Sequence, residues 1–302
     1  GPERITRPTF SPRETRPSPP TRRPSVSGMS DDLGPASLPH YTHGHAAAVL
    51  ASHARRTAAN CAPRLLPVLR PGLDLLDVGC GPATITADLA EAVLPGRVVA
   101  LDGAPAALDA ARATLRERGL DDRVELVGAD AQALPFADGS FDVVHAHQVL
   151  QHVADPVGAL REMRRVTRPG GVVAARDAVY SAMAWFPRPP ALEDWRRVYT
   201  ATARANGGEP DAGARLLSWC RTAGLTEAAP SASTWCYATP ELRSWWGGTW
   251  AERVLTSFGP QAVDAGLATS ADLTQMARAW RRWAEADDGW FVVVHGEVLA
   301  RR

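Results

Sequence analysis

The chain has 302 residues, of which 45% are hydrophobic, and its formal net charge is zero. This length suits one large domain with insertions, or one domain with a cap, and the apolar content is enough for a sizeable core. The charge balance argues against a broad basic surface for nucleic acid, and no run of about 18 apolar residues predicts a membrane span. Four cysteines without C-x-x-C spacing, and no apolar signal-peptide core, predict a reduced, cytoplasmic protein.

The N-terminal part is expected to contribute little to the core. Residues 1–39 are rich in Pro, Arg, Ser and Thr, which predicts a disordered segment, and Met29 could be the natural start. The segment Y-T-H-G-H then precedes a helix expected over residues 46–60. Its two histidines lack a third ligand nearby, so a polar turn that caps the helix is favoured over a metal site.

Residues 75–90, L-L-D-V-G-C-G-P-A-T-I-T-A-D-L-A, predict a buried strand, a tight glycine turn and a helix. Gly79 and Gly81 let the backbone approach a ligand, and the new helix presents unpaired N–H groups. A dinucleotide would need G-x-G-x-x-G. Here the sixth position of the frame is Thr84, and Pro82 removes a donor N–H.

The D-x-G-x-G pattern at Asp77, Gly79 and Gly81 instead resembles motif I of the class I S-adenosylmethionine-dependent methyltransferases. That family usually has a third glycine where this chain has Ala83. The resemblance extends to the run G-A-D-A-Q-A-L-P-F-A-D-G-S-F-D-V-V, residues 128–144, which is similar to the subgroup that includes the quinone-biosynthesis methyltransferases. It implies that S-adenosylmethionine is the cofactor.

Two acids follow the next two expected strands. Asp102 ends a strand at residues 97–101, where a carboxylate can accept hydrogen bonds from both ribose hydroxyls. Capping of the next helix is a weaker alternative, because Ala104 and Pro105 already open that helix. Asp130 follows a strand at residues 124–127, and the resemblance implies that it binds the adenine amino group.

Three histidines, His145, His147 and His152, lie at or just after the end of the strand that begins at Phe141. Ligands bind beyond the carboxyl ends of such strands, so His147 is placed to contact the cofactor or the substrate, whereas His152 is interpreted mainly as a packing residue. The resemblance also implies that an N-terminal lid, residues 40–60, closes over the cofactor. The predicted cofactor-binding residues are Tyr41, Asp77, Gly79, Cys80, Gly81, Asp102, Gly103, Asp130, Ala131 and His147.

The second half of the chain is expected to complete the sheet and to add a cap. All ten tryptophans lie after position 184. Helices are predicted over residues 192–206, 211–223, 240–258 and 270–285, and strands over residues 172–175, 226–237 and 290–299. The predicted fold is a doubly wound α/β, Rossmann-like methyltransferase fold, with a mostly parallel seven-stranded sheet and a helical, Trp-rich cap in the C-terminal half. Residues 61–178 would form the cofactor-binding core, and residues 179–302 its C-terminal part with insertions at about 180–210 and 240–288.

The predicted function is transfer of a methyl group to an O, N or C atom of a small hydrophobic or aromatic metabolite, in secondary metabolism. No metal is needed, and His147 and His45 are candidate general bases if the acceptor must lose a proton. Arg176, Trp185 and Trp246 are the candidate substrate contacts. A nicotinamide-dependent oxidoreductase and a non-catalytic cofactor-binding protein are the alternatives, and a homodimer is the assembly that we consider.

Overall fold

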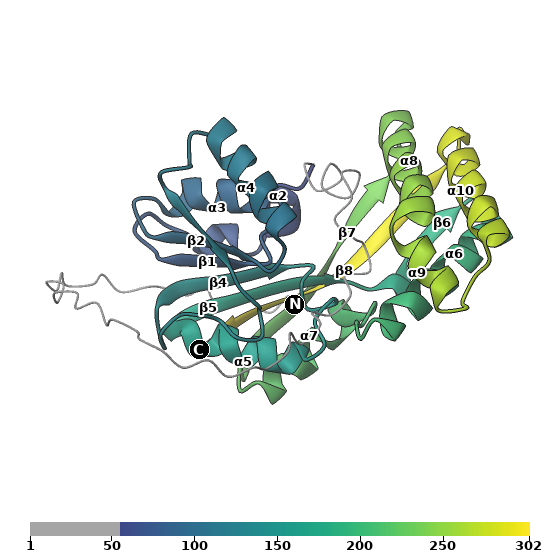
Figure 1. Ribbon diagram of the computed structural model, residues 1–302. Helices are drawn as coiled ribbons and strands as arrows, with labels where there is room; N and C mark the ends of the chain where they lie inside the picture. The colour runs from purple at the N-terminus through teal and green to yellow at the C-terminus, as the bar shows by residue number, and fades with distance from the viewer. Residues whose placement is uncertain (1–54) are drawn as a thin grey trace, which may run out of the picture. The chain divides into compact units, whose positions relative to one another are not determined.

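The computed structural model describes residues 55–302. The predicted disordered segment, Tyr41, His45 and most of the predicted lid helix lie outside the described residues. Within these residues one eight-stranded sheet runs in the order β3-β2-β1-β4-β5-β8-β6, and β7 pairs with the other edge of β8 (Figure 1). The strands are β1 Leu75–Val78, β2 Val98–Asp102, β3 Val124–Gly128, β4 Phe141–His147, β5 Thr167–Ala178, β6 Ala184–Phe186, β7 Glu227–Tyr237 and β8 Trp290–Arg301.

Strands β1 to β5 are parallel, and β8 is antiparallel to its three neighbours. This is the predicted α/β sheet, with one addition. The short strand β6 was not predicted, and it pairs with residues 290–292, where β8 runs past the end of β5. Strand β5 is also longer than predicted, because β8 pairs with it as far as Ala178.

Helices cover both faces of the sheet (Figure 1). Successive strand residues point to opposite faces, so Leu75 packs with α2, α3 and α4, whereas Leu76 packs with α5 and α7. The helices are α2 Ala58–Cys61, α3 Thr84–Val93, α4 Pro105–Glu117, α5 Pro156–Val166, α6 Pro190–Ala205, α7 Ala212–Thr222, α8 Pro240–Thr256, α9 Phe258–Asp264 and α10 Ser270–Glu285. Helix α5 begins after Asp155, whose side chain accepts a hydrogen bond from the Gly158 N–H.

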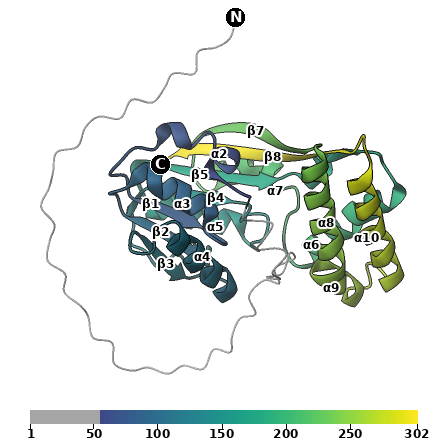
Figure 2. The same cartoon turned by 90° about the horizontal axis from the view of Figure 1, so that it is seen from above.

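Helices α6, α8, α9 and α10 form a separate group beyond the far ends of β7 and β8, which we call the helical part (Figure 2). Its core is aromatic: the ring of Trp195 lies 4.6 Å from that of Trp250 and 4.8 Å from that of Trp280. Helices α8 and α10 pack closely at Gly247, where a Cβ atom would lie 2.7 Å from the Cβ atom of Ala284. Six tryptophans therefore belong to a buried aromatic cluster in this part of the chain: Trp185, Trp195, Trp246, Trp250, Trp280 and Trp283.

Strands β7 and β8 connect the sheet to the helical part. They pair over the whole of β7, from Glu227 opposite Arg301 to Tyr237 opposite Phe291. The C-terminal half of β8 also pairs with β5, whereas Phe291 belongs to the aromatic core of the helical part. This pairing fixes the register of β7 against β8 from the sheet to the helical part.

Candidate active site

A cavity of about 600 Å³ lies where β1, β2, β3 and β4 end, and we call it the strand-end cavity. Parallel strands bring their carboxyl ends to one edge of a sheet, so turns that are far apart in sequence meet there. The predicted cofactor-binding residues that line it are Asp77, Gly79, Cys80, Gly81, Asp102, Gly103, Asp130, Ala131 and His147. Tyr41 lies outside the described residues.

The turn after β1 depends on left-handed backbone. Gly79 and Gly81 have φ values of 68° and 53°, and Ala83 has a φ of 57°. A Cβ atom on Gly79 would also lie 2.4 Å from Cγ2 of Val149, so no larger residue fits there without movement. Ala83 takes the conformation for which a third glycine would be suited, which costs about 1–2 kcal/mol in a residue with a Cβ atom.

The two predicted acids reach the same cavity and are both partly exposed. The carboxylate of Asp102 accepts hydrogen bonds from the N–H groups of Gly81 and Ala104, at 3.0 and 2.9 Å. Asp130 accepts one from the backbone N–H of Gln132 at 2.8 Å, and the side-chain amide nitrogen of Gln132 lies 3.4 and 3.5 Å from its two oxygens. Each carboxylate oxygen can accept more than one hydrogen bond, so both acids retain capacity for a ligand.

Asp77 is different, because its side chain is 2% exposed and both oxygens have protein partners. The hydroxyl of Thr86 donates to Oδ2 at 2.5 Å, and Nδ1 of His145 lies 2.8 Å from Oδ1. Thr86 is on α3 and His145 is on β4. Asp77 therefore links β1 to α3 and to β4, and it also lines the strand-end cavity.

His147 ends β4 and is 5% exposed. Neither ring nitrogen has a hydrogen-bond partner among the described residues. Burial, and then the charges of Arg56 and Arg176, hold the pKa of His147 well below its usual range. The imidazole is therefore neutral and only weakly basic at neutral pH. His45, the other candidate base, lies outside the described residues.

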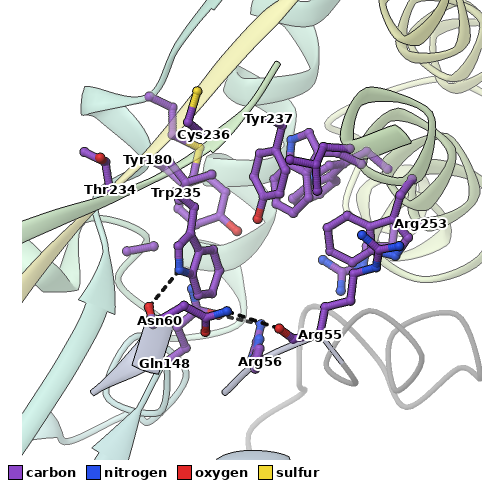
Figure 3. A pocket seen from close by; sticks show the side chains of 17 residues that line it. Arg55, Arg56, Asn60, Gln148, Tyr180, Thr234, Trp235, Cys236, Tyr237 and Arg253 are labelled. Carbon is purple, nitrogen blue, oxygen red and sulfur yellow. Dashed lines mark hydrogen bonds between the residues drawn. The ribbon is translucent and has the colours of Figure 1, made fainter. Parts of the chain in front are cut away.

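A second cavity, of about 480 Å³, lies between β7, α8 and residues 55–60 (Figure 3). We call it the aromatic cavity, because five aromatic side chains of β7 and α8 line it: Trp235, Tyr237, Trp245, Trp246 and Trp250. Arg55, Arg56 and Arg253 also line it. The ring of Tyr237 is stacked on Trp246 with centroids 4.2 Å apart.

Arg56 and Gln148 line both cavities. The Nη2 group of Arg56 donates a hydrogen bond to Oε1 of Gln148 at 2.7 Å. Gln148 directly follows β4 and has a positive φ of 54°, and its backbone N–H donates to the carbonyl oxygen of Arg176 at 2.7 Å. Strained backbone of this kind is common at functional sites. The two cavities thus adjoin at a pair of polar side chains.

The three candidate substrate contacts are placed differently. Trp246 lines the aromatic cavity. Trp185 lines neither cavity and stacks on Phe291 in the core of the helical part, with centroids 5.5 Å apart. Arg176 also lines neither cavity and is 3% exposed. Its guanidinium carbon lies 4.7 Å from the ring centroid of Trp235, which lines the aromatic cavity.

Arg176 is held by three polar partners. It forms an ion pair with Glu297 at 3.0 Å and donates to the hydroxyl of Ser233 at 3.1 Å. Its Nη2 group lies 2.9 Å from Nδ1 of His295. These contacts hold the Arg176 side chain against Trp235 in the wall of the aromatic cavity, because β5 continues through Arg176 and pairs it with Glu297 on β8. A direct contact of Arg176 with substrate stays a prediction.

Sequence reasoning missed Arg56, Gln148, Trp235 and Arg253. The strand alternation of β7 could have paired Trp235 with Tyr237 on one face. No sequence signal joins Arg56 to Gln148, which is 92 positions away.

Residues 55–302 lack two kinds of feature. They include no group of three His, Cys, Asp or Glu side chains that could hold a metal ion. None of the helices in this range is both long and apolar enough to cross a membrane. The four cysteines are free thiols, and Cys61, Cys80 and Cys220 are buried.

The strand order, the glycine turn after β1 and the two acids at the ends of β2 and β3 define a Rossmann-like methyltransferase. A family model for the methyltransferase domain matches residues 76–175. An uncharacterised methyltransferase of Schizosaccharomyces pombe is 32% identical over 278 residues, which cover 89% of this chain and 98% of the relative. The chain therefore belongs to the class I S-adenosylmethionine-dependent methyltransferases, and S-adenosylmethionine is its cofactor.

Other relatives agree. A demethylmenaquinone methyltransferase of a Parafrankia species is 36% identical over 204 residues, 61% of this chain and 78% of the relative. The crystal structure of a methyltransferase-like protein from Bacillus halodurans has a TM-score of 0.51 at 21% identity, over 79% of this chain and 97% of that one, and shows the same fold. Family membership favours a small-molecule methyltransferase over the oxidoreductase and the non-catalytic protein considered from the sequence.

Proposed function

We propose that the enzyme methylates an oxygen, nitrogen or carbon atom of a small hydrophobic or aromatic metabolite bound in the aromatic cavity. One observation carries the proposal: this cavity shares Arg56 and Gln148 with the strand-end cavity. Its volume of about 480 Å³ lies within the range of small-molecule sites. An acceptor there would be adjacent to a cofactor bound at the strand ends.

The strand-end cavity suits S-adenosylmethionine by its donor set. Asp102 would hold the ribose hydroxyls and Asp130 the adenine amino group, since both carboxylates can accept further hydrogen bonds. The glycine turn would lie against the amino-acid part, where a Cβ atom on Gly79 would already be too close to Val149. When bound, this cofactor supplies an electrophilic methyl group on a positively charged sulfur.

The protein's own part is to orient the acceptor and to exclude water. The aromatic side chains that line the aromatic cavity can position a planar molecule. His147 is a weak base, because its pKa lies well below its usual range, and it lines only the strand-end cavity. We therefore assign His147 to the cofactor side, as a neutral hydrogen-bond acceptor. Secondary metabolism, a cytoplasmic location and a homodimer stay predictions.

The test is transfer of label from methyl-labelled S-adenosylmethionine to metabolites of an extract of the host cell. We expect label in a small aromatic or apolar compound with the purified enzyme, and its loss with Trp246→Ala. A matched control is Trp219→Ala, which changes a partly buried tryptophan on α7 outside both cavities. Label confined to nucleic acid or protein, or unaffected by Trp246→Ala, would contradict the proposal.

A further inference from the structure

We propose that the methyl acceptor is a planar aromatic compound with an anionic oxygen, a carboxylate or a phenolate, and that Arg56 binds this group. This inference rests on the proposed function, because it takes the aromatic cavity as the acceptor site. It goes further in naming the charge of the acceptor and the residue that recognises it.

The charged side chains that line the aromatic cavity are all positive. Arg55, Arg56 and Arg253 line it, and no Asp or Glu is among its described lining residues. Arg253 is only 4% exposed. Positive charges in a cleft with apolar walls focus the electrostatic potential, so an anion is attracted and a cation is repelled.

The aromatic rings do not change this conclusion. Tryptophan faces can form a cage for an ammonium group, but here arginines already lie against three of them. The guanidinium carbons of Arg55 and Arg253 are 5.2 Å from the ring centroids of Trp245 and Trp250. Arg56 is 5.7 Å from the ring centroid of Trp235. Arginines of the protein thus already occupy the cation positions at these rings, and a ligand in the cavity should carry the opposite charge.

Tyr237 adds a hydrogen-bond donor. Burial raises the pKa of its phenol, so the hydroxyl stays protonated at neutral pH. Its ring is stacked on Trp246 at an interplanar angle of 8°. A flat aromatic ligand with an acceptor oxygen could therefore accept a hydrogen bond from this O–H group and pack against the other aromatic side chains that line the cavity.

The hydrogen bonds of Gln148 favour Arg56 as the arginine that binds the anionic oxygen of the ligand. Burial and the charge of Arg176 keep the pKa of His295 well below its usual range, so this imidazole is neutral. Its Nδ1 accepts from Arg176 at 2.9 Å, which places its single proton on Nε2, and the imidazole also has a hydrogen bond with the backbone of Val293. Nε2 lies 2.9 Å from the Gln148 amide nitrogen, on the side away from Arg56.

The amide of Gln148 therefore stands between two N–H donors, Arg56 and His295, and has one oxygen to offer. With its oxygen toward Arg56, the amide turns its NH₂ group toward the His295 ring. An anionic oxygen next to Arg56 would accept that N–H and free the amide oxygen for His295. The ligand would thus offer Arg56 an acceptor beside the single oxygen of the Gln148 amide.

The test uses three probes of the same size: 2-naphthoate, neutral 2-naphthamide and cationic 2-naphthylmethylamine. Calorimetric titration of the full chain, saturated with S-adenosylhomocysteine, measures the Kd of each. We expect naphthoate to bind about tenfold or more tightly than naphthamide, the scale of one hydrogen bond to a charged group, and the cation to bind most weakly. Equal or tighter binding of the amide or of the cation would overturn the inference.

The substitution Arg56→Gln should abolish the preference for naphthoate over naphthamide. Arg55→Gln, at an exposed side chain where folding is not at risk, should reduce it. The matched control Arg197→Gln removes the same charge from α6, where the side chain is 68% exposed and pairs with Asp194, and should leave the preference unchanged. If Arg56→Gln fails to fold, a preference unaffected by Arg55→Gln would refute the inference.

The titration with S-adenosylhomocysteine alone separates the two proposals. If the unmodified enzyme binds this compound but shows no preference for naphthoate, the inference about charge fails and the proposed function stands. If no aromatic probe binds at all, and Trp246→Ala changes no activity, the aromatic cavity is not the acceptor site and the proposed function itself fails.

Discussion

The carboxylate of Asp102 joins two turns, because it accepts N–H groups from Gly81 and from Ala104. If it also holds the ribose, Asp102→Ala should weaken binding of S-adenosylhomocysteine by about 1–3 kcal/mol, the range for lost hydrogen bonds to a charged group. Calorimetry measures the change. Asp109→Ala, at an exposed position on α4, is the control, and affinity that is equal in the two variants would remove Asp102 from the binding site.

His147 offers a second test at the scale of one residue. Its side chain lines the strand-end cavity and not the aromatic cavity, and both ring nitrogens lack partners among the described residues. We expect His147→Ala to weaken cofactor binding by about 1 kcal/mol, the value of a typical hydrogen bond, with a smaller effect on kcat. Steady-state kinetics with calorimetry can separate the two. A large fall in kcat at unchanged affinity would restore His147 as a general base.

Asp177 should make stability depend on pH. The side chain is fully buried, and Oδ2 has no hydrogen-bond partner among the described residues. Burial raises its pKa to about 8, so between about pH 4 and 8 the folded protein holds a proton that the unfolded chain has released. The free energy of unfolding should therefore fall by about 1.4 kcal/mol per pH unit on account of this group as pH rises through that window.

The variant Asp177→Asn lacks this dependence. Its melting temperature relative to the unmodified protein should rise steadily from pH 5 to pH 8 and then level off. Thermal unfolding followed by tryptophan fluorescence at several pH values measures the difference. A constant difference across this range would show that the carboxyl is not protonated in the folded protein.

At the scale of elements, two neighbouring glycines of α8 have opposite surroundings. A Cβ atom on Gly247 would lie 2.7 Å from the backbone oxygen of Trp280 and from Ala284 on α10, whereas Gly248 has nothing within 4 Å. Gly247→Ala should therefore destabilise the protein by about 1–3 kcal/mol through overpacking. Gly248→Ala should stabilise it by up to about 1 kcal/mol, because alanine favours a helix. Thermal unfolding of both variants compares them, and shifts of the same sign would contradict this account.

The sequence predicted the parallel strands best. β2 and β3 begin within one residue of the predicted starts, because each is a short apolar run that a polar turn ends. The positions of Asp102 and Asp130 follow from those ends, and the structure brings both acids to one cavity.

The helical part was less accessible to sequence reasoning. Helix α8 buries both Trp246 and Arg253, so its pattern does not separate a core face from a ligand face. Trp185 and Trp246 look equivalent in sequence, yet only Trp246 lines a cavity. Such distinctions depend on how several helices pack together, and no local pattern encodes them. The short elements β6 and α9 were missed for the same reason.

At the scale of the whole molecule, the shared wall of the two cavities predicts coupled binding. Arg56 and Gln148 line both, so a ligand that fills the strand-end cavity removes water from their surroundings and strengthens charge interactions there. S-adenosylhomocysteine should therefore raise the affinity for 2-naphthoate by about fivefold or more, within the usual range of coupling energies.

Thermodynamic linkage requires naphthoate to raise the affinity for S-adenosylhomocysteine by the same factor. Calorimetric titrations in both orders measure the two factors, and Arg56→Gln should bring both close to one. Independent binding of the two compounds to the unmodified enzyme would mean that Arg56 and Gln148 do not transmit the effect.

The long pairing of β7 with β8 has a consequence for enzyme design. Helices α8, α9 and α10 all lie between the end of β7 and the start of β8, so they form one exchangeable cassette with both ends anchored in the sheet. Under the proposed function, replacing that cassette with its contacts to Trp195 on α6 preserved would alter acceptor choice and leave the loops after β1 to β4 intact. A single residue inserted into β7 before Trp235 would turn Trp235 to the other side of the strand and remove it from the wall of the aromatic cavity.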